Sequence, residues 1–244
     1  MISVRKLTKT LGTQAVLRGV NLEVGRGQTC VILGRSGSGK SVLLKHLIGL
    51  FKPTAGEVWV DGEEITHLRE RELGSVRKKV GILFQSAALF DSMTVEGNIA
   101  FPLRESGVKN PQEIADRVAE ALEMVDLAGE QKKMPENLSG GMRKRVGLAR
   151  TIVSRPACIL YDEPTTGLDP IATDSINRLI RRLQKRLSVT SVVVTHDMKT
   201  AFHTADRVAY LHDGLIYFEG TVGELQASHD PLIDDFIEGR SGDE

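Results

Sequence analysis

The stretch Gly34-Arg35-Ser36-Gly37-Ser38-Gly39-Lys40-Ser41 decides the fold, because it fits the pattern G-x-x-x-x-G-K-[ST] of a phosphate-binding loop. Residues 29–33 before it form an apolar run that indicates a buried strand, and residues 42–48 after it indicate a helix. Glycines let successive backbone N–H groups turn towards a phosphate, and the helix N-terminus adds unpaired donors. Lys40 would supply a positive charge for the β- and γ-phosphates, and Ser41 a hydroxyl for Mg²⁺.

The composition of the 244-residue chain limits the possible classes of protein. Lys plus Arg and Asp plus Glu both number 32, so the formal net charge is zero, which argues against a protein dedicated to binding nucleic acid. Residues 1–6 lack the apolar region of a signal peptide, and no apolar run approaches the length of a membrane span. We therefore expect a soluble or peripheral protein, with Cys30 and Cys158 as reduced core residues.

Apolar segments along the chain predict strands of two kinds. Residues 2–7 and 20–24 alternate apolar and polar side chains, as half-buried antiparallel strands do, and residues 57–65 predict a hairpin that turns at Asp61-Gly62. Continuous apolar runs predict buried strands at 79–84, 158–161 and 191–195. A helix predicted at 170–187 lies between the last two. Helices that alternate with buried strands indicate a parallel sheet covered on both faces.

Helical periodicity replaces the strand signals over about residues 86–156. Residues 111–126 repeat apolar side chains at helical spacing, and a second helix is expected over about 139–154, with Ser139 as its N-cap. We therefore predict a helical subdomain inserted into the α/β core. The second helix carries four basic side chains, Arg143, Lys144, Arg145 and Arg150. They form a solvated face, or at least some of them contact phosphate or structural carboxylates. The sequence does not distinguish these two possibilities.

The C-terminal part of the chain is predicted to add a last pair of strands to the core, followed by a short tail outside it. A last strand pair is expected over 207–219, with its turn at Asp213-Gly214. A short tail over 226–244 follows, with amphipathic pieces. Its final residues, Gly239 to Glu244, are expected to be disordered.

Four polar side chains follow predicted buried strands directly. Asp162 and Glu163 come after residues 158–161, and Gln85 and His196 stand at the ends of two other strands. Ligands of open α/β sheets bind at the carboxyl ends of the strands, so we expect these side chains near the phosphate-binding loop. Asp162 is then placed to hold Mg²⁺ through water, and Glu163 to act as general base towards an attacking water.

The other two residues have less specific roles. Gln85 would contact the Mg²⁺ or the water, and His196 would donate a hydrogen bond to the γ-phosphate. Single polar residues at strand ends are more often ordinary surface, but here two of them fall where a phosphate site is expected.

Residues 1–225 resemble the ATPase subunit of an ABC transporter. The motifs that carry the resemblance are, in chain order, the Walker A stretch Gly34 to Ser41, the Q-loop residue Gln85, the signature Leu138-Ser139-Gly140-Gly141-Met142, the Walker B stretch Ile159 to Glu163, the D-loop Gly167-Leu168-Asp169 and the switch residue His196. The resemblance implies a P-loop NTPase fold: an α/β core with a parallel sheet, an antiparallel β subdomain and the inserted helical subdomain.

The resemblance also implies partners and cofactors. Two copies would form a head-to-tail dimer that binds ATP and Mg²⁺ between the P-loop of one copy and Ser139, Gly140, Gly141 and Asp169 of the other. The dimer would work on a membrane permease, as a peripheral protein on the cytoplasmic face of the inner membrane. Residues 83–90 and 98–105 resemble the Mla/Mce-type lipid-transport ATPases, which implies a phospholipid or other hydrophobic substrate and an Mce-domain protein as a further partner.

Other functions of the family stay open. An ABC ATPase for a different substrate fits the same motifs. A soluble ABC ATPase of DNA repair or translation usually carries a long coiled-coil insert or two ATPase units, and this chain has neither. A non-hydrolysing regulatory subunit is disfavoured by the presence of Glu163 and His196.

Two departures from the family pattern matter. Met142 stands where many members have Gln in the signature, and Leu11 stands where many have an aromatic residue that stacks on adenine. The second departure predicts modest discrimination between ATP and GTP.

Leu11→Tyr is therefore expected to tighten ATP binding, because a stacking contact contributes about 1–3 kcal/mol where it exists. Titration of both variants with ATP and GTP measures the effect. An unchanged ATP affinity would mean that another residue covers the base.

Overall fold

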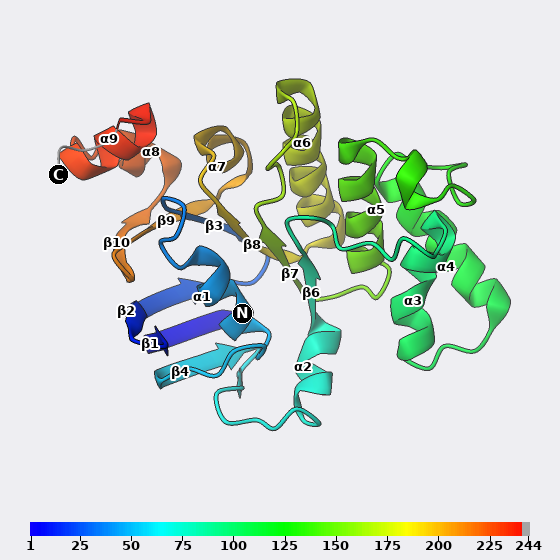
Figure 1. Ribbon diagram of the computed structural model, residues 1–244, viewed down its shortest axis with the longest axis horizontal. Coiled ribbons are helices and arrows are strands. Elements are labelled where there is room, and N and C mark those ends of the chain that lie inside the picture. Colours follow the sequence, from blue (N-terminus) through cyan, green and yellow to red (C-terminus); the bar gives the residue numbers. More distant parts are fainter. Residues whose placement is uncertain (241–244) are drawn as a thin grey trace.

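The computed structural model describes residues 1–240, whose strands form a larger, mostly parallel sheet and a smaller antiparallel one (Figure 1). The predicted α/β fold class, with its parallel sheet and antiparallel β part, is confirmed. Within this described part, no helix is long and apolar enough to cross a membrane.

The larger sheet positions the candidate site. Its strands are β3 (Thr29–Leu33), β6 (Val80–Leu83), β7 (Cys158–Asp162), β8 (Thr190–Thr195), β9 (Arg207–His212) and β10 (Leu215–Gly220). They lie in the order β10-β9-β3-β8-β7-β6, and all neighbours are parallel except β10 and β9. The carboxyl ends of β3, β6, β7 and β8 therefore meet at one edge of the sheet.

The smaller sheet contains β1 (Ile2–Leu11), β2 (Gln14–Val24), β4 (Ala55–Val60) and β5 (Glu63–Glu64), in the order β2-β1-β4-β5. The strands predicted at 2–7 and 20–24 are both longer than expected. In β1 the register breaks between Val4 and Leu7, where Lys6 has a φ of 47° and interrupts the alternation that marks a strand.

Two hydrophobic cores lie on opposite faces of the larger sheet. Val31 and Leu33 of β3 face α6 (Pro170–Leu187) and α7 (Met198–Thr204), whereas Cys30 and Ile32 face α1 (Lys40–Leu47) and the smaller sheet. Successive side chains of a strand point to opposite faces, so one short apolar strand serves both cores. The second core also includes α2 (Leu73–Lys79), a helix that the sequence pattern did not predict.

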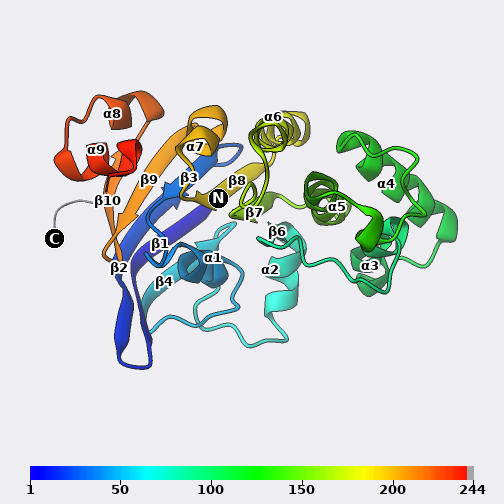
Figure 2. The same ribbon diagram turned by 45° about the horizontal axis from the view of Figure 1, so that its top comes forward.

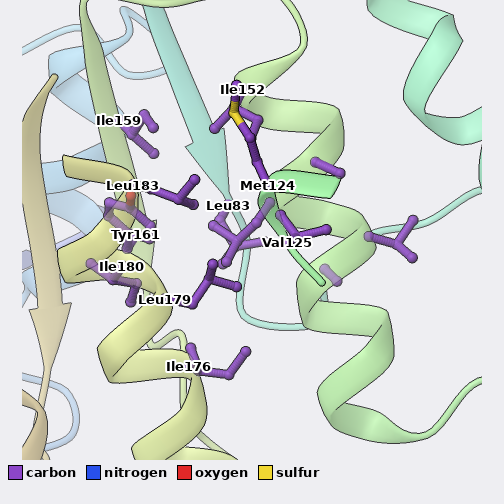
Figure 3. Close-up of a cluster of buried hydrophobic side chains, with 14 of the residues drawn as sticks. Leu83, Met124, Val125, Ile152, Ile159, Tyr161, Ile176, Leu179, Ile180 and Leu183 are labelled. Atoms are coloured by element: carbon purple, nitrogen blue, oxygen red, sulfur yellow. The ribbon is translucent and has the colours of Figure 1, made fainter. Parts of the chain in front are cut away.

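The chain between β6 and β7 forms helices and turns only, as predicted for residues 86–156. These helices are α3 (Val95–Glu105), α4 (Pro111–Met124), the 3₁₀ helix η1 (Pro135–Asn137) and α5 (Gly140–Ile152). They lie together at the opposite end of the molecule from β10 and the C-terminus (Figures 1 and 2). Figure 3 shows how they join the core: Val125 and Ile152 lie among side chains of β6, β7 and α6.

Helix boundaries follow their capping residues. The predicted helix 170–187 is confirmed as α6, which begins after the N-cap Asp169 and ends at Ser188 in a left-handed conformation. The predicted helix 111–126 ends earlier, at Met124, because the chain turns at Asp126 with a φ of 57°. The turns at Asp61-Gly62 and Asp213-Gly214 are confirmed, and all four residues have positive φ.

The C-terminal segment forms two short helices against the core. These are α8 (Val222–Gln226) and α9 (Pro231–Glu238), and the expected domain boundary at 225 falls inside α8. Ile233 of α9 is buried, and the ring of Phe236 lies 4.8 Å from that of Tyr210. The predicted disorder at the end of the chain falls largely on residues 241–244, which lie outside the described residues.

The two cysteines occupy β3 and β7, as expected of core residues. Both are buried and unpaired. Burial raises the pKa of each thiol to about 12, so neither is a reactive thiolate at neutral pH.

Candidate functional site

The loop between β3 and α1 has the backbone conformation of a phosphate-binding loop. Gly37 and Gly39 have φ values of 83° and 101°, which L side chains rarely adopt. At Gly34 a Cβ would lie 2.6 Å from the backbone oxygen of Leu211, so no larger residue fits there. Helix α1 begins directly at Lys40, so its N-terminal N–H groups open towards this loop.

Lys40 reaches back across the loop from the start of α1. Its Nζ donates to the backbone oxygens of Gly34 and Arg35 at 2.8 and 3.0 Å, and lies 3.6 Å from a carboxylate oxygen of Glu163. Burial lowers the pKa of Lys40, and the nearby carboxylates of Glu163 and Asp162 oppose that shift. The ammonium group is therefore already held at the mouth of the loop, where a phosphate would be bound.

Ser41 and Asp162 join the loop to β7. The Ser41 hydroxyl donates to Asp162 Oδ1 at 2.8 Å, although the two residues are 121 positions apart in the chain. Asp162 is the last residue of β7 and is 8 % exposed. A hydroxyl and a carboxylate oxygen side by side are hard oxygen ligands of the kind that Mg²⁺ prefers, so the donor set fits this ion.

Glu163 is fixed in an uncommon backbone conformation. Its φ is 47°, and its N–H donates to the backbone oxygen of Val194 at 2.9 Å. The carboxylate accepts hydrogen bonds from Thr166 at 3.1 Å and Thr195 at 3.3 Å, and lies 3.0 Å from His196 Nδ1. Glu163 thus lies between the Lys40 ammonium and the His196 ring.

The structure brings five of the predicted side chains into one cluster: Lys40, Ser41, Asp162, Glu163 and His196. His196 is half exposed, whereas both carboxylates are buried. Gln85 lies two residues after the end of β6 and is exposed. Its backbone oxygen accepts a hydrogen bond from Lys144, and no hydrogen bond of its side chain is present among residues 1–240.

The residues of the predicted signature and D-loop form a second, separate cluster. Ser139 caps α5 as predicted, with its hydroxyl accepting from the Met142 N–H at 3.3 Å, and Asp169 caps α6 in the same way. A Cβ on Gly140 would lie 3.3 Å from Leu168, so the start of α5 faces the D-loop of its own chain. In the part of the chain that the structure describes, no hydrogen bond joins this cluster to the phosphate-binding loop.

Sequence reasoning missed three residues that hold the site. Thr166 and Thr195 bind the Glu163 carboxylate, and Lys144 binds the backbone oxygens of Gln85 and Glu163. The one sequence signal for these residues is the position of Thr195, which is the last residue of a predicted strand and directly precedes His196. The partners of Lys144 are 59 and 19 residues away, and no local pattern reveals such contacts.

The basic side chains of α5 turn mainly inwards, which rules out a simple solvated face. Lys144 is 5 % exposed, and Arg150 donates to the backbone oxygens of Ala87 and Ala88. Arg145 contacts a structural carboxylate, Asp126, at 2.7 Å, and Arg143 donates to the backbone oxygen of Leu138. Backbone oxygens, which the sequence analysis did not consider, are thus the main acceptors.

Comparison with known families agrees with this arrangement. The profile of the ABC transporter family matches residues 17–166. The mkl protein of Mycobacterium leprae, named as a probable ribonucleotide transport ATP-binding protein, is 42% identical over 239 residues, which is 98% of this chain and 69% of that protein. The methionine import protein MetN of Carboxydothermus hydrogenoformans is 45% identical over 220 residues, 89% of this chain and 65% of MetN.

A relative named for phospholipid transport is similar over almost the whole chain. The intermembrane phospholipid transport system ATP-binding protein MlaF of Haemophilus influenzae is 41% identical over 241 residues, 99% of this chain and 91% of MlaF. Among solved structures, the dimeric ATP-binding cassette MJ0796 bound to ADP and Pi superposes with a TM-score of 0.83 at 35% identity, over 91% of this chain and 99% of that one. The cbiO1 protein of Clostridium perfringens reaches 0.85 at 29% identity, over 97% and 94% of the two chains.

Proposed function

This chain belongs to the ABC transporter family as an ATP-hydrolysing subunit, and we propose that it powers a separate membrane permease that moves phospholipid or another hydrophobic substrate. The observation that carries the ATPase assignment is the cluster around the P-loop. There Lys40 and Ser41 at the start of α1 meet Asp162 and Glu163 at the end of β7, two segments that are distant in sequence, within hydrogen-bond or ion-pair distance.

Each residue of the cluster has a proposed role. Glu163 acts as general base, because its carboxylate is oriented by Thr166, Thr195 and His196 and lies 3.6 Å from the Lys40 ammonium. Lys40 holds the β- and γ-phosphates, and His196 donates to the γ-phosphate. Ser41, Asp162 and Gln85 hold Mg²⁺, which when bound neutralises charge on the phosphates.

A second copy of the chain completes the proposed site. The cluster of Ser139, Gly140, Gly141 and Asp169 has no bond to the P-loop within the described residues of one chain, so it is available to a P-loop of another copy. The N-terminus of α5 offers N–H groups suited to an anion such as the γ-phosphate. The dimeric form of the structural neighbour MJ0796 supports a head-to-tail dimer with ATP at the interface.

The phospholipid substrate is supported by one relative and competes with others. MlaF supports it, whereas MetN and mkl carry names that point to methionine and ribonucleotides. In the phospholipid case, the partners are an Mla/Mce-type permease and an Mce-domain protein. The chain then acts on the cytoplasmic face of the inner membrane. In its domain organisation, residues 1–225 form the ATPase domain, which includes the helical subdomain at about 86–156, and residues 226–244 form the tail.

A groove beside the helical subdomain is the proposed docking surface for the permease. It has a volume of about 360 Å³ and is lined by apolar side chains and by a few basic ones. Phe90 is 40 % exposed, and its ring lies 4.8 Å from that of Phe101. Asn98 fixes the backbone of Phe90 through two hydrogen bonds. Leu89, in contrast, packs against the core.

The proposed occupant is a short amphipathic helix of the permease. The groove offers aromatic anchors, Phe84, Phe90 and Phe101, and basic side chains, Arg77 and Lys78. Such a helix would insert two or three apolar residues and place carboxylates beside the basic side chains. Phe84 and Ala88, on either side of Gln85 in the chain, line the groove. A movement of Gln85 on nucleotide binding would therefore change the position of the docked helix.

The first test of this function is Glu163→Gln. An amide cannot accept the proton of the attacking water, so kcat for ATP hydrolysis is expected to fall on the order of 10²–10⁴-fold while ATP binding is kept. The variant is expected to accumulate as an ATP-bound dimer, measured by size-exclusion chromatography with and without ATP.

Lys40→Ala is the matched control, because it removes the other half of the same ion pair. It is expected to weaken nucleotide binding itself. Hydrolysis at the wild-type rate by Glu163→Gln would show that another group is the base.

The second test concerns the groove. Phe90→Glu is expected to abolish binding of the permease and its stimulation of ATP hydrolysis, because a carboxylate replaces an apolar anchor. Basal hydrolysis by the isolated chain is expected to stay within about twofold. A pull-down with the tagged permease and an ATPase assay measure both.

Phe202→Glu is the control, since Phe202 is similarly exposed, at 37 %, but lies on α7. Leu89→Glu is less informative, because Leu89 packs against the core and its substitution disturbs folding. Normal permease binding by Phe90→Glu would place the docking surface elsewhere.

The third test addresses the substrate. The chain is purified with its permease and reconstituted into nanodiscs made of phosphatidylglycerol and phosphatidylethanolamine. Methionine or ribonucleotides are then added to separate samples. For a lipid transporter, changes in phospholipid composition are expected to alter ATP turnover, and mass spectrometry is expected to find phospholipid bound to the complex. Stimulation by methionine or a ribonucleotide, with no effect of lipid, would assign the chain to those transporters instead.

A further inference from the structure

Lys144 is a buried cation without an anionic partner among residues 1–240. It lies on α5, is 5 % exposed, and has no carboxylate oxygen within 4.0 Å in that part of the chain. Its Nζ instead donates to two backbone oxygens, those of Gln85 and of Glu163, the latter at 3.3 Å. Gln85 is proposed to hold Mg²⁺ and Glu163 to act as general base, so one ammonium group joins the two loops that carry these residues.

A cation at this position is costly. Burial lowers the pKa of Lys144, and the fields of Glu163 and Asp162 favour its charged form. A methionine of nearly the same length would fill the space without loss of hydration. Unlike a methionine, the ammonium group donates two directed hydrogen bonds to separate loops.

A second side chain of α5 holds the same loop. Arg150 donates to the backbone oxygens of Ala87 at 2.6 Å and of Ala88 at 2.8 Å. Ala87 and Ala88 have φ values of 61° and 47°, a conformation that costs an L residue roughly 1–2 kcal/mol. The loop after Gln85 is thus kept in an uncommon shape by bonds from α5, independently of the contact made by Lys144.

We propose that Lys144 is a positioning residue for ATP hydrolysis, which ties the backbone at Gln85 to the backbone at Glu163. The same helix begins with Ser139 and Gly140, so a displacement of α5 would move both loops together. This inference rests on the proposed ATPase site. Lys144 acts through its contacts to the two backbone oxygens, which fix the position of the Gln85 loop relative to the base Glu163.

The test compares Lys144→Met with Arg145→Met in the full chain. For Lys144→Met, kcat is expected to fall at least about tenfold, whereas KM and the ATP dissociation constant change less than about threefold. Arg145 is the matched control, because it is the next residue of α5 and also donates to a backbone oxygen, that of Val125. Its contacts lie directly after the end of α4 and on α6. Arg145→Met is expected to keep kcat within about twofold.

A second readout separates positioning from stability. Hydrogen exchange of segments 84–90 and 162–167 is followed with and without a non-hydrolysable ATP analogue. In the wild type, the two segments are expected to gain protection together; in Lys144→Met, segment 162–167 is expected to respond without segment 84–90. If Lys144→Met does not fold, Lys144→Gln replaces it. Its shorter amide serves only one of the two oxygens, so the same loss of kcat is expected.

Two results would overturn the proposal. One is a kcat for the Lys144 variant within twofold of wild type. The other is a loss of kcat equal to that of Arg145→Met, with protection of both segments still coupled, which would make Lys144 a purely structural residue. Neither result would contradict the ATPase assignment, which is tested separately by Glu163→Gln.

Discussion

The parallel pairing of β3, β7 and β8 is the constraint on which the whole candidate site depends. Leu33 pairs with Thr195 and Asp162 with Val194, so the three strands end side by side. The N–H of Glu163 continues the pairing with the backbone oxygen of Val194 beyond the end of β7. A shift of β7 by one residue would exchange its two faces and turn Asp162 away from Ser41. The positions of the polar side chains at this edge therefore depend on the register of the sheet.

Charge within the site is balanced by groups that are themselves buried. Lys40 and Lys144 face Asp162 and Glu163, which gives two cations and two carboxylates in a small volume. Both ammonium groups replace lost hydration with hydrogen bonds to backbone oxygens, and Lys40 adds an ion pair with Glu163 at 3.6 Å. Burial lowers the pKa of both lysines, and the nearby carboxylates of Glu163 and Asp162 oppose that shift.

Much of the fold was predictable from the sequence because its signals are local. Helix α6 matches its predicted range, since Asp169 caps one end and the apolar side chains recur at helical spacing. The P-loop, the Walker B carboxylates and His196 were found for the same reason: each follows directly on a buried strand. Helix α2 escaped prediction because it has only seven residues, and of these Leu73 and Val76 are the buried ones.

The contacts that orient the site were not predictable, because they join segments that are far apart in sequence. Nothing near Lys144 indicates that its partners are backbone oxygens of Gln85 and Glu163. The lengths of β1 and β2 were underestimated for a related reason. Their outer halves alternate poorly and are strands only because they pair with each other, as Lys9 does with Leu17.

The conformation of Glu163 connects these points to catalysis. A φ of 47° costs a glutamate roughly 1–2 kcal/mol, and such strain persists only where the surroundings impose it. Here they do so with bonds from Thr166 and Thr195 to the carboxylate, and with backbone bonds to Val194 and Lys144. A glycine would adopt this φ without strain but would bring no carboxylate. The strain is therefore compensated by contacts that hold an acidic side chain between Lys40 and His196, as the proposed role of Glu163 as general base requires.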